Sequence, residues 1–253
     1  MIKKIIKNII SAVFWLTVWQ IMSQVIGSEL LLPSPVTVFL RIITLASTFE
    51  FWYIISASFV RVLAAIVISI VLGVILAVFT SRYVLVDALI SPIMNVIKAT
   101  PVASFIMLAL LWINRDVLPV FISVLIVVPV VWANVCGGIK NVDKSLLSVT
   151  YAYKFSFFRR LKRLYIPSVY PYFWSACRSS LGLAWKSAIA AEVLAVPVFA
   201  IGKMIYSSKM YLETVDLFAW STVVILLSVI IEYVFCAMVK KMGSRFERQV
   251  TVC

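Results

Sequence analysis

Long runs without a charged residue alternate with short polar segments along this chain. Three runs contain no Lys, Arg, Asp or Glu: residues 8–28, 62–81 and 117–139. Because a helix needs about 20 apolar residues to cross the hydrocarbon core of a bilayer, each of these runs can span a membrane. Two shorter runs, 99–114 and 217–231, reach that length when each is extended through one ionisable residue.

Together these runs predict an all-α integral membrane protein with a single domain over residues 1–253. One further segment, 174–201, is apolar apart from three ionisable residues and completes the set. We expect the first span to be retained, because it is too long for a signal peptide and no small-residue cleavage site follows it. The six expected spans lie at about residues 9–27, 54–80, 88–112, 117–137, 174–201 and 216–239.

The composition excludes a soluble protein. Mean hydropathy is +1.10 and 13% of the residues are charged, whereas about a quarter of the residues are charged in soluble domains. The chain has no histidine, and its four cysteines form no CxxC pair. The sequence therefore indicates no metal site, no disulfide framework and no catalytic residues.

The distribution of Lys and Arg predicts the orientation, because these residues collect in cytoplasmic loops. If the N-terminus lies inside, fifteen basic residues fall on the cytoplasmic side and only four fall outside. We therefore expect both termini in the cytoplasm. The net charge of +13 then reflects membrane insertion and indicates no binding to nucleic acid. The four outside residues are Arg41, Arg115, Lys203 and Lys209.

The loop between the fourth and fifth spans, residues 140–170, is basic and rich in aromatic residues. Ser156 is suited to cap a short helix that begins at Phe157. Pro167 is expected to end this helix, because the residue before a proline avoids the helical conformation. From these residues alone, the helix either lies on the inner leaflet of the membrane or docks on a partner. Its apolar positions at helical spacing are Phe157, Phe158, Leu161, Leu164 and Tyr165.

Other stretches stand around this loop in a fixed order. LLPSPVTVF at 31–39 precedes the second span, and KATPVASF at 98–105 lies in the third. IPSVYPYF at 166–173 and LGLAWKSAIAAEVLA at 181–195 follow the loop. In this order, within a chain of six spans, they resemble the permease subunits of bacterial ABC importers. The branch that they resemble serves sulfonates, taurine, nitrate and thiamine or pyrimidine precursors.

That family carries a signature in the loop: Glu-Ala-Ala, three residues, Gly, nine residues, and then Ile-x-Leu-Pro. Anchored on Pro167, the signature places Leu164 and Ile166 at its hydrophobic positions, Lys154 at its glycine and residues 148–150 at its Glu-Ala-Ala. The end of the loop matches the signature, whereas its start departs from it. A serine replaces the acidic residue, and Lys154 carries a Cβ where glycine allows a positive φ. At that position the chain either turns or continues as a helix.

The resemblance implies a division of labour. This chain has no GxxxxGK[ST] phosphate loop, so ATP and Mg would be bound by two ATPase subunits, and no cofactor is expected in this chain. The resemblance favours docking of the loop on a partner, as a coupling helix between spans 4 and 5, over the alternative that the loop lies on the inner leaflet. It also implies a second permease subunit, expected to be a second copy, and an extracytoplasmic binding protein. That protein would deliver a small anionic or heterocyclic solute across the bacterial cytoplasmic (inner) membrane. The residues expected to dock are Ser148, Lys154, Ser156, Phe157, Phe158, Leu161 and Pro167.

Ionisable residues inside spans indicate a pathway, because they are costly in lipid and tend to face a cavity or a partner. Lys186 and Glu192 cannot pair with each other, since six residues turn a helix by about 600° and lift it by about 9 Å. Lys186 attracts an anionic substrate, together with Lys98, or it snorkels or pairs with a backbone carbonyl. Arg61 is expected to snorkel to the outer surface, and Glu232 to pair with a basic neighbour.

Prolines within spans give a second indication, because each frees a carbonyl that needs another partner. Pro101 lies in the third span, and LAVPVFAIG at 194–202 is expected to form a break or re-entrant turn at the outer end of the fifth. The pathway candidates are Lys98, Pro101, Lys186 and Glu192.

Two other classes of protein are alternatives to an ABC permease. An ion-coupled secondary transporter is the main alternative, but such proteins usually show internal repeats, and none is visible here. A membrane-embedded enzyme would need a cluster of nucleophiles, carboxylates or histidines, which this chain lacks. The sequence does not specify the solute.

Overall fold

The structure, a computed structural model, describes the backbone of residues 2–250 and, within that range, all side chains except those of 2–5, 7–9, 236 and 238–250. Every regular element in the described range is a helix, as the uncharged runs predict. The elements are α1 (Ile2–Ile26), α2 (Pro35–Ala46), α3 (Phe49–Arg82), α4 (Val84–Ala99), α5 (Val102–Ala109), α6 (Leu118–Lys140), α7 (Lys144–Ala152), α8 (Phe157–Arg160), η1 (Leu161–Tyr165), α9 (Ile166–Ala195), α10 (Ile201–Met210) and α11 (Thr214–Val250).

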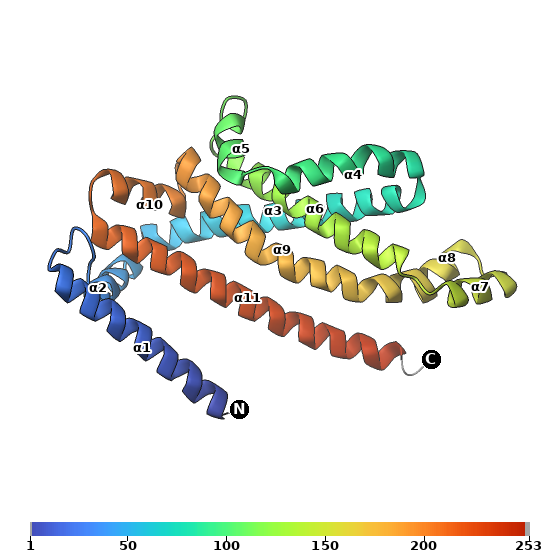
Figure 1. The fold of residues 1–253 in the computed structure, drawn as a ribbon, viewed down its shortest axis with the longest axis horizontal. Coiled ribbons are helices and arrows are strands. Elements are labelled where there is room, and N and C mark those ends of the chain that lie inside the picture. Colours follow the sequence, from blue (N-terminus) through green and yellow to red (C-terminus); the bar gives the residue numbers. More distant parts are fainter. Residues whose placement is uncertain (1, 251–253) are drawn as a thin grey trace.

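Three long helices form the centre of an elongated bundle (Figure 1). Helix α6 packs along both α3 and α9, and these contacts hold most of the buried apolar side chains. Gly73 of α3 lies so close to α6 that a Cβ at this position would come within 2.7 Å of Val131. The absence of a side chain at residue 73 therefore permits the two helices to pack tightly.

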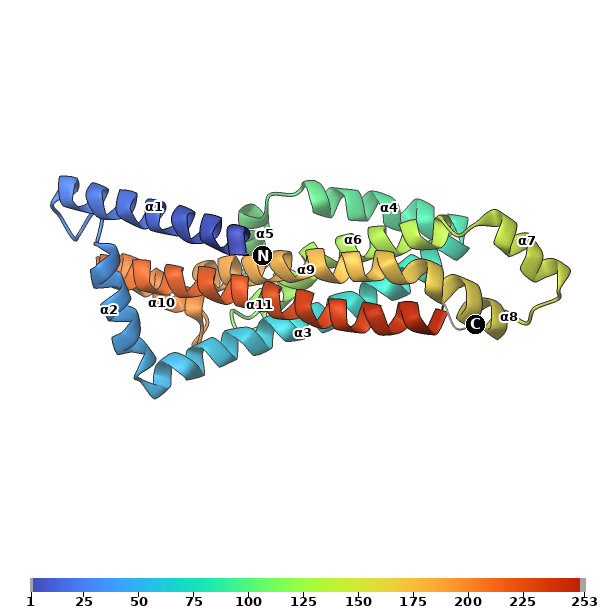
Figure 2. The ribbon, with the colours of Figure 1, turned by 90° about the horizontal axis from the view of Figure 1, so that it is seen from below.

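Outer helices surround this centre. Figure 2 shows α1 along one side of the bundle, connected to it through α2. Ser34 accepts a hydrogen bond from the Thr37 N–H and caps α2, so the LLPSPVTVF stretch starts a helix. Arg41 of α2 donates two hydrogen bonds to the carboxylate of Asp216 of α11. One runs from Nε to Oδ1, and the other runs from Nη2 to Oδ2 at 2.7 Å. This ion pair fixes α2 to the start of the last helix.

The expected spans map onto helices of different character. Among the described residues, α3, α6 and the Thr214–Phe235 part of α11 are long and apolar enough to cross a membrane, and the α4–α5 pair makes a fourth if it counts as one span. The other two expected spans coincide with α1 and α9. The number of six spans therefore stays a prediction.

The segment expected to be one helix at 88–112 is broken. Helices α4 and α5 are bent by 104° relative to each other, and the break falls at Thr100 and Pro101. Thr100 has an extended backbone with φ −75° and ψ 130°, because a residue before proline is excluded from the helical region by the proline ring. Pro101 then precedes α5 as its N-cap, where its missing N–H breaks no hydrogen bond within a helix.

Candidate functional site

The loop at 140–170 begins with a capped helix. The carboxylate of Asp143 accepts hydrogen bonds from the hydroxyl and from the N–H of Ser145, the latter at 2.8 Å. These two hydrogen bonds stabilise the ionised form and hold the pKa of the Asp143 carboxyl below its usual value. The Ser148 hydroxyl donates to the Lys144 carbonyl at 2.8 Å, so it is bound within its own helix, α7.

A sharp turn separates α7 from α8. Lys154 has a φ of +50°, the left-handed conformation that glycine adopts most easily. The Lys154 N–H donates to the Tyr151 carbonyl at 3.0 Å, and the Phe155 N–H donates to the Thr150 carbonyl at 2.9 Å. These two bonds form a Schellman motif, which ends a helix. The turn is thus present although lysine occupies the family's glycine position, and no helix runs through it.

Helix α8 starts where the sequence predicts, but Pro167 does not end it. Ser156 has the extended backbone of a cap without a side-chain cap hydrogen bond, and the helix then passes through η1 into α9 without a break. In η1 the Ile166 N–H bonds to the Leu161 carbonyl, five residues back. This wider π-type turn accommodates the ring of Pro167 in the first turn of α9. The expectation that proline stops the helix here was wrong for this reason.

Two aromatic side chains project from α8. Phe157 is 66% exposed and Phe158 is 79% exposed, and their rings meet edge to face at 5.8 Å. Leu161 is also exposed, whereas Leu164 is buried. Among the residues whose side chains the structure describes, no apolar neighbour covers this pair of phenylalanines at the end of the bundle.

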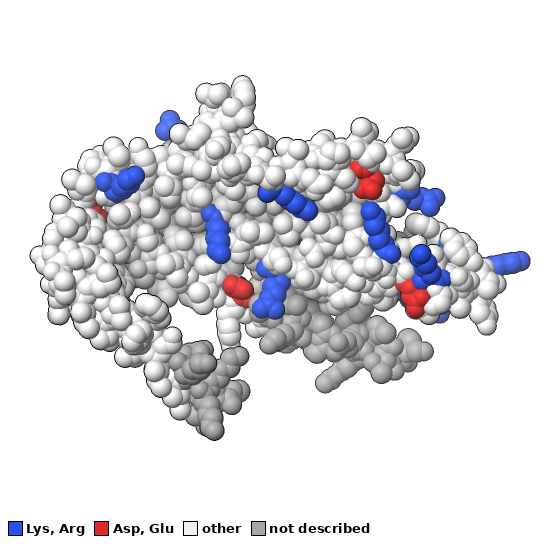
Figure 3. Space-filling view, viewed as in Figure 1, with Lys and Arg blue, Asp and Glu red and all other residues white. Residues whose placement is uncertain are grey.

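The same loop carries a basic surface. The sequence predicts that the loop is basic, but it does not predict the contacts between the basic and the aromatic side chains. The Arg160 guanidinium lies 4.6 Å from the ring of Tyr151, and Arg159 lies 5.5 Å from that of Phe155. The contact with Tyr151 joins α8 to α7 across the turn, and the contact with Phe155 holds α8 against the turn itself. In Figure 3 the surface is mostly uncharged, and several basic side chains stand at the end formed by α7 and α8.

Lys186 lies on an exposed stripe along α9. Residues 183, 186, 190 and 194 of α9 are all exposed, at spacings that place them on one face of the helix. Among the described residues, the Lys186 ammonium has no hydrogen bond or ion pair. The last residue of the stripe, Leu194, lines a hollow of about 470 Å³ together with Asn114 and Arg115 of the α5–α6 loop.

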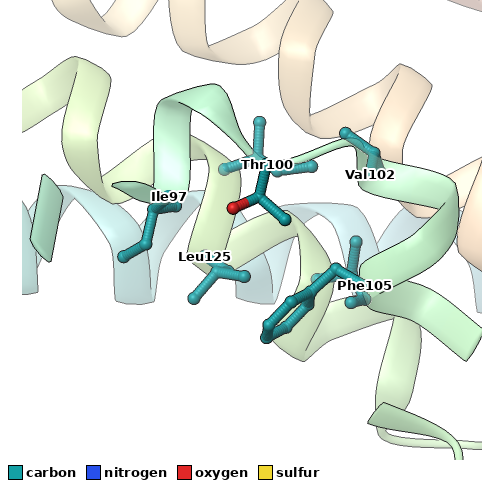
Figure 4. A pocket seen from close by; sticks show the side chains of 7 residues that line it. Ile97, Thr100, Val102, Phe105 and Leu125 are labelled. Carbon is teal, nitrogen blue, oxygen red and sulfur yellow. The ribbon is translucent and has the colours of Figure 1, made fainter. Parts of the chain in front are cut away.

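The other lysine and the proline candidate lie near the break between α4 and α5. Lys98 is exposed, and its ammonium lies 5.5 Å from the centre of the Trp132 ring. Beside the break, Figure 4 shows Thr100 and Phe105 at a small apolar pocket that Ile97, Val102 and Leu125 also line. The structure does not bring Lys98 and Lys186 into contact.

Glu192 is fully buried, in contrast to Lys186 on the same helix. Its Oε1 accepts a hydrogen bond from Arg61 at 3.2 Å, and its Oε2 accepts from the Ser58 hydroxyl at 2.9 Å and from the Gly202 N–H at 3.2 Å. The carboxylate therefore joins α3, α9 and α10. The two side chains lie on different faces of α9, in accord with their helical spacing.

Arg61 was expected to snorkel to the outer surface, but it does not. Its guanidinium binds Glu192 and also donates to the Phe199 carbonyl at 2.6 Å. Sequence reasoning missed this cluster because it considered only partners on the same helix. The available signal was that Arg61 and Glu192 both lie toward the outer ends of their expected spans, where one buried charge can neutralise the other.

Comparisons with known proteins agree with this architecture. Residues 69–245 match the model of the binding-protein-dependent transport system inner membrane component family. The putative aliphatic sulfonates transport permease protein SsuC of Bacillus subtilis is 23% identical over 206 residues, covering 81% of this chain and 74% of SsuC. The taurine transport system permease protein TauC of Escherichia coli is 22% identical, covering 86% of this chain and 81% of TauC.

Solved structures show the same fold. An amino acid ABC transporter chain superposes with a TM-score of 0.59 at 16% identity, covering 78% of this chain and 94% of that one. A chain of the MetNI methionine ABC transporter in inward-facing conformations gives a TM-score of 0.53 at 19% identity, covering 79% and 93%. The resemblance found in the sequence is confirmed: this chain belongs to the family of binding-protein-dependent transport system inner membrane components, the permeases of ABC importers.

Proposed function

We propose that this chain forms the translocation pathway of an ATP-driven importer and couples to its ATPase subunits through the loop at 140–170. The exposed Phe157–Phe158 pair on a helix continuous with α9 is the observation that carries this proposal. An amphipathic helix that docks in a groove uses apolar residues as anchors. The two rings supply such anchors, and any movement of α8 is passed directly to α9.

The remaining docking residues have supporting roles. The Schellman turn at Lys154 sets the direction of α8 relative to α7. The Ser156 backbone and the π-type turn before Pro167 join α8 to both neighbours. Ser148 lies on α7, where its hydroxyl is bound to the Lys144 carbonyl. The surrounding basic side chains would steer docking and hold the loop near the anionic inner leaflet.

The exposed stripe of α9 is the proposed wall of the pathway. A charged side chain is costly in lipid, so Lys186 is better placed toward water than toward acyl chains. The stripe leads to the hollow beside Arg115, which adds a second positive charge. The relatives SsuC and TauC are named for sulfonates and taurine, and another, NrtB of Leptolyngbya laminosa, for nitrate. These observations favour a small anionic solute, with Lys98 and Pro101 near the bend of the third span.

The assembly follows from the family. Two permease subunits, expected to be two copies of this chain, would pair in the bacterial inner membrane with both termini in the cytoplasm. Two ATPase subunits would bind ATP and Mg, and an extracytoplasmic binding protein would deliver the solute. Each subunit would cross the membrane six times, with α1 and α9 as the two remaining spans.

Affinity purification tests this function. The tagged chain is extracted from its native membranes in mild detergent, and the bound proteins are identified together with any ATP hydrolysis. We expect an ATPase subunit to co-purify at a 1:1 ratio to the permease, as two of each per complex requires. If the permease purified without an ATPase and drove solute uptake from an ion gradient alone, secondary transport would be the function.

A further inference from the structure

The loop between α9 and α10, residues 196–200, is not helical and begins with a left-handed residue. Val196 has a φ of +51°, which is rare for a β-branched residue and persists only where the surrounding structure fixes it. Its N–H still donates to the Glu192 carbonyl at 2.9 Å. This backbone conformation turns the chain back toward α3 and α10.

Side chains from neighbouring elements satisfy the backbone of this loop. The Val198 N–H donates to the Asp116 carboxylate at 3.2 Å, and the Val198 carbonyl accepts from the Lys203 ammonium at 3.0 Å. The Ile201 N–H donates to the Ser58 hydroxyl at 3.0 Å. Because non-helical backbone inside a membrane needs such partners, these bonds fix the loop to α3, α10 and the α5–α6 loop.

Glu192 is the centre of this arrangement. Its side chain is fully buried, and both of its carboxylate oxygens accept hydrogen bonds. Arg61 extends the cluster, since it binds Glu192 and the Phe199 carbonyl at the same time. We call Ser58, Arg61, Glu192 and the Gly202 N–H the carboxylate clamp. No part of the Glu192 side chain is left to contact a solute.

The clamp lies at the far end of the helix that begins at the docking aromatics. Helix α8, η1 and α9 run without a break from Phe157 to Ala195, a distance of roughly 55–60 Å at 1.5 Å per residue. Figure 1 shows α8 at one end of this rod and α10 beside the other end. Movement of α8 therefore reaches the 196–200 loop through one continuous element.

We propose that Glu192 is a positioning residue that fixes the 196–200 loop to this rod, so that ATPase closure on α8 moves the loop at the opposite side of the membrane. The transmission part of this inference rests on the proposed function, whereas the clamp itself does not. In this account Lys186 faces the pathway, and Glu192 controls the position of the loop without touching the solute.

Cysteine labelling tests the clamp. Val198 is 52% exposed, so Val198→Cys, in a chain with Cys236 and Cys253 replaced by Ser, reports access to the loop by a membrane-impermeant maleimide. Glu192→Gln keeps the size of the side chain and removes its charge. In the purified permease we expect Glu192→Gln to raise the labelling rate about ten-fold, as loss of charge-assisted hydrogen bonds frees the loop.

Two matched variants keep this test decisive. Glu232→Gln makes the same change at an exposed carboxylate on α11 and should leave the labelling rate unchanged. Ser58→Ala removes one donor to Glu192 and the acceptor of the Ile201 N–H, and should give a smaller rise. A labelling rate in both Glu192→Gln and Ser58→Ala equal to that of the parent would overturn the clamp.

The complex with its co-purified ATPase tests transmission. Trapping with ATP and orthovanadate should change the labelling of Val198→Cys when Glu192 is present, and should have no effect in Glu192→Gln. If trapping left the parent unchanged although the ATPase was bound and active, transmission would be wrong and the proposed function would stand. If no ATPase bound the permease, transmission would fall together with the proposed function.

Discussion

A Cβ atom at position 202 would lie 2.4 Å from the Cβ of Glu192, closer than two carbon atoms that are not bonded to each other can approach. It would also lie 2.4 Å from the Val193 N, so a flexible side chain cannot relieve the contact. We expect Gly202→Ala to destabilise the protein by about 3 kcal/mol, because the backbone of α9 or α10 must move. Unfolding by SDS in mixed micelles measures this loss.

Gly182→Ala is the matched control for that change. A Cβ at Gly182 meets no atom within 4 Å, and alanine favours the helix by up to about 1 kcal/mol. We therefore expect Gly182→Ala to keep or raise stability. Equal losses in the two variants would contradict the close approach of α10 to Glu192.

The pattern of uncharged runs predicted the all-helical class, because such runs are a direct consequence of lipid contact. It did not predict the bend at Pro101, since an apolar run reads the same whether its helix is straight or broken. It also did not predict that the helix continues through Pro167, because the π-type turn that accommodates the ring depends on backbone geometry rather than on residue type.

The candidate site was predictable only in its local parts. Ser156, Phe157 and Phe158 could be placed on a short helix from capping and spacing alone. The binding of Arg61 to Glu192 joins residues 131 positions apart, and no single-sequence pattern specifies which spans pack together. The family signature marked position 154 as a glycine position, but lysine itself does not favour a positive φ, so only the backbone shows that the chain turns there.

The left-handed turn at Lys154 predicts that glycine at this position stabilises the loop. Lys154→Gly removes a Cβ penalty of about 1 kcal/mol and should slow chymotryptic cleavage of the loop by two- to five-fold, since about 1.4 kcal/mol corresponds to ten-fold. Lys154→Ala removes the charge but keeps the Cβ, so it should not slow cleavage. Slower cleavage in both variants would mean that the charge, and not the backbone, limits the turn.

Lys186 is expected to act on the solute. Lys186→Ala should lower uptake about ten-fold while membrane insertion and ATPase binding stay intact, because a ten-fold loss corresponds to about 1.4 kcal/mol, the size expected for one lost charge contact with the solute. Uptake is measured with labelled taurine, an alkanesulfonate and nitrate, using whichever the cells accumulate. Lys186→Arg should retain most of the uptake, and Lys209→Ala, at an exposed position on α10, should change nothing. Normal uptake by Lys186→Ala at every concentration would remove this lysine from the pathway.

Topology gives an independent prediction. With both termini in the cytoplasm, a reporter that needs the periplasm should be inactive when it is fused after Cys253. The same reporter inserted near Ser207 of α10 should be active. The excess of Lys and Arg lies in the loops on the other side of the membrane, which places the Ser207 segment outside. The reverse pattern would place the loop at 140–170 on the wrong side for ATPase docking.

Co-purification of the ATPase with a Phe157→Ala, Phe158→Ala double variant tests the central claim most directly. Buried aromatic anchors cost upwards of about 2 kcal/mol each on truncation, whereas single charges at the rim cost much less. We predict that the double variant inserts normally but loses its ATPase, while Arg159→Ala keeps it. If the double variant kept the ATPase and removal of the basic residues released it, the charges would form the contact and the aromatic anchors would be wrong.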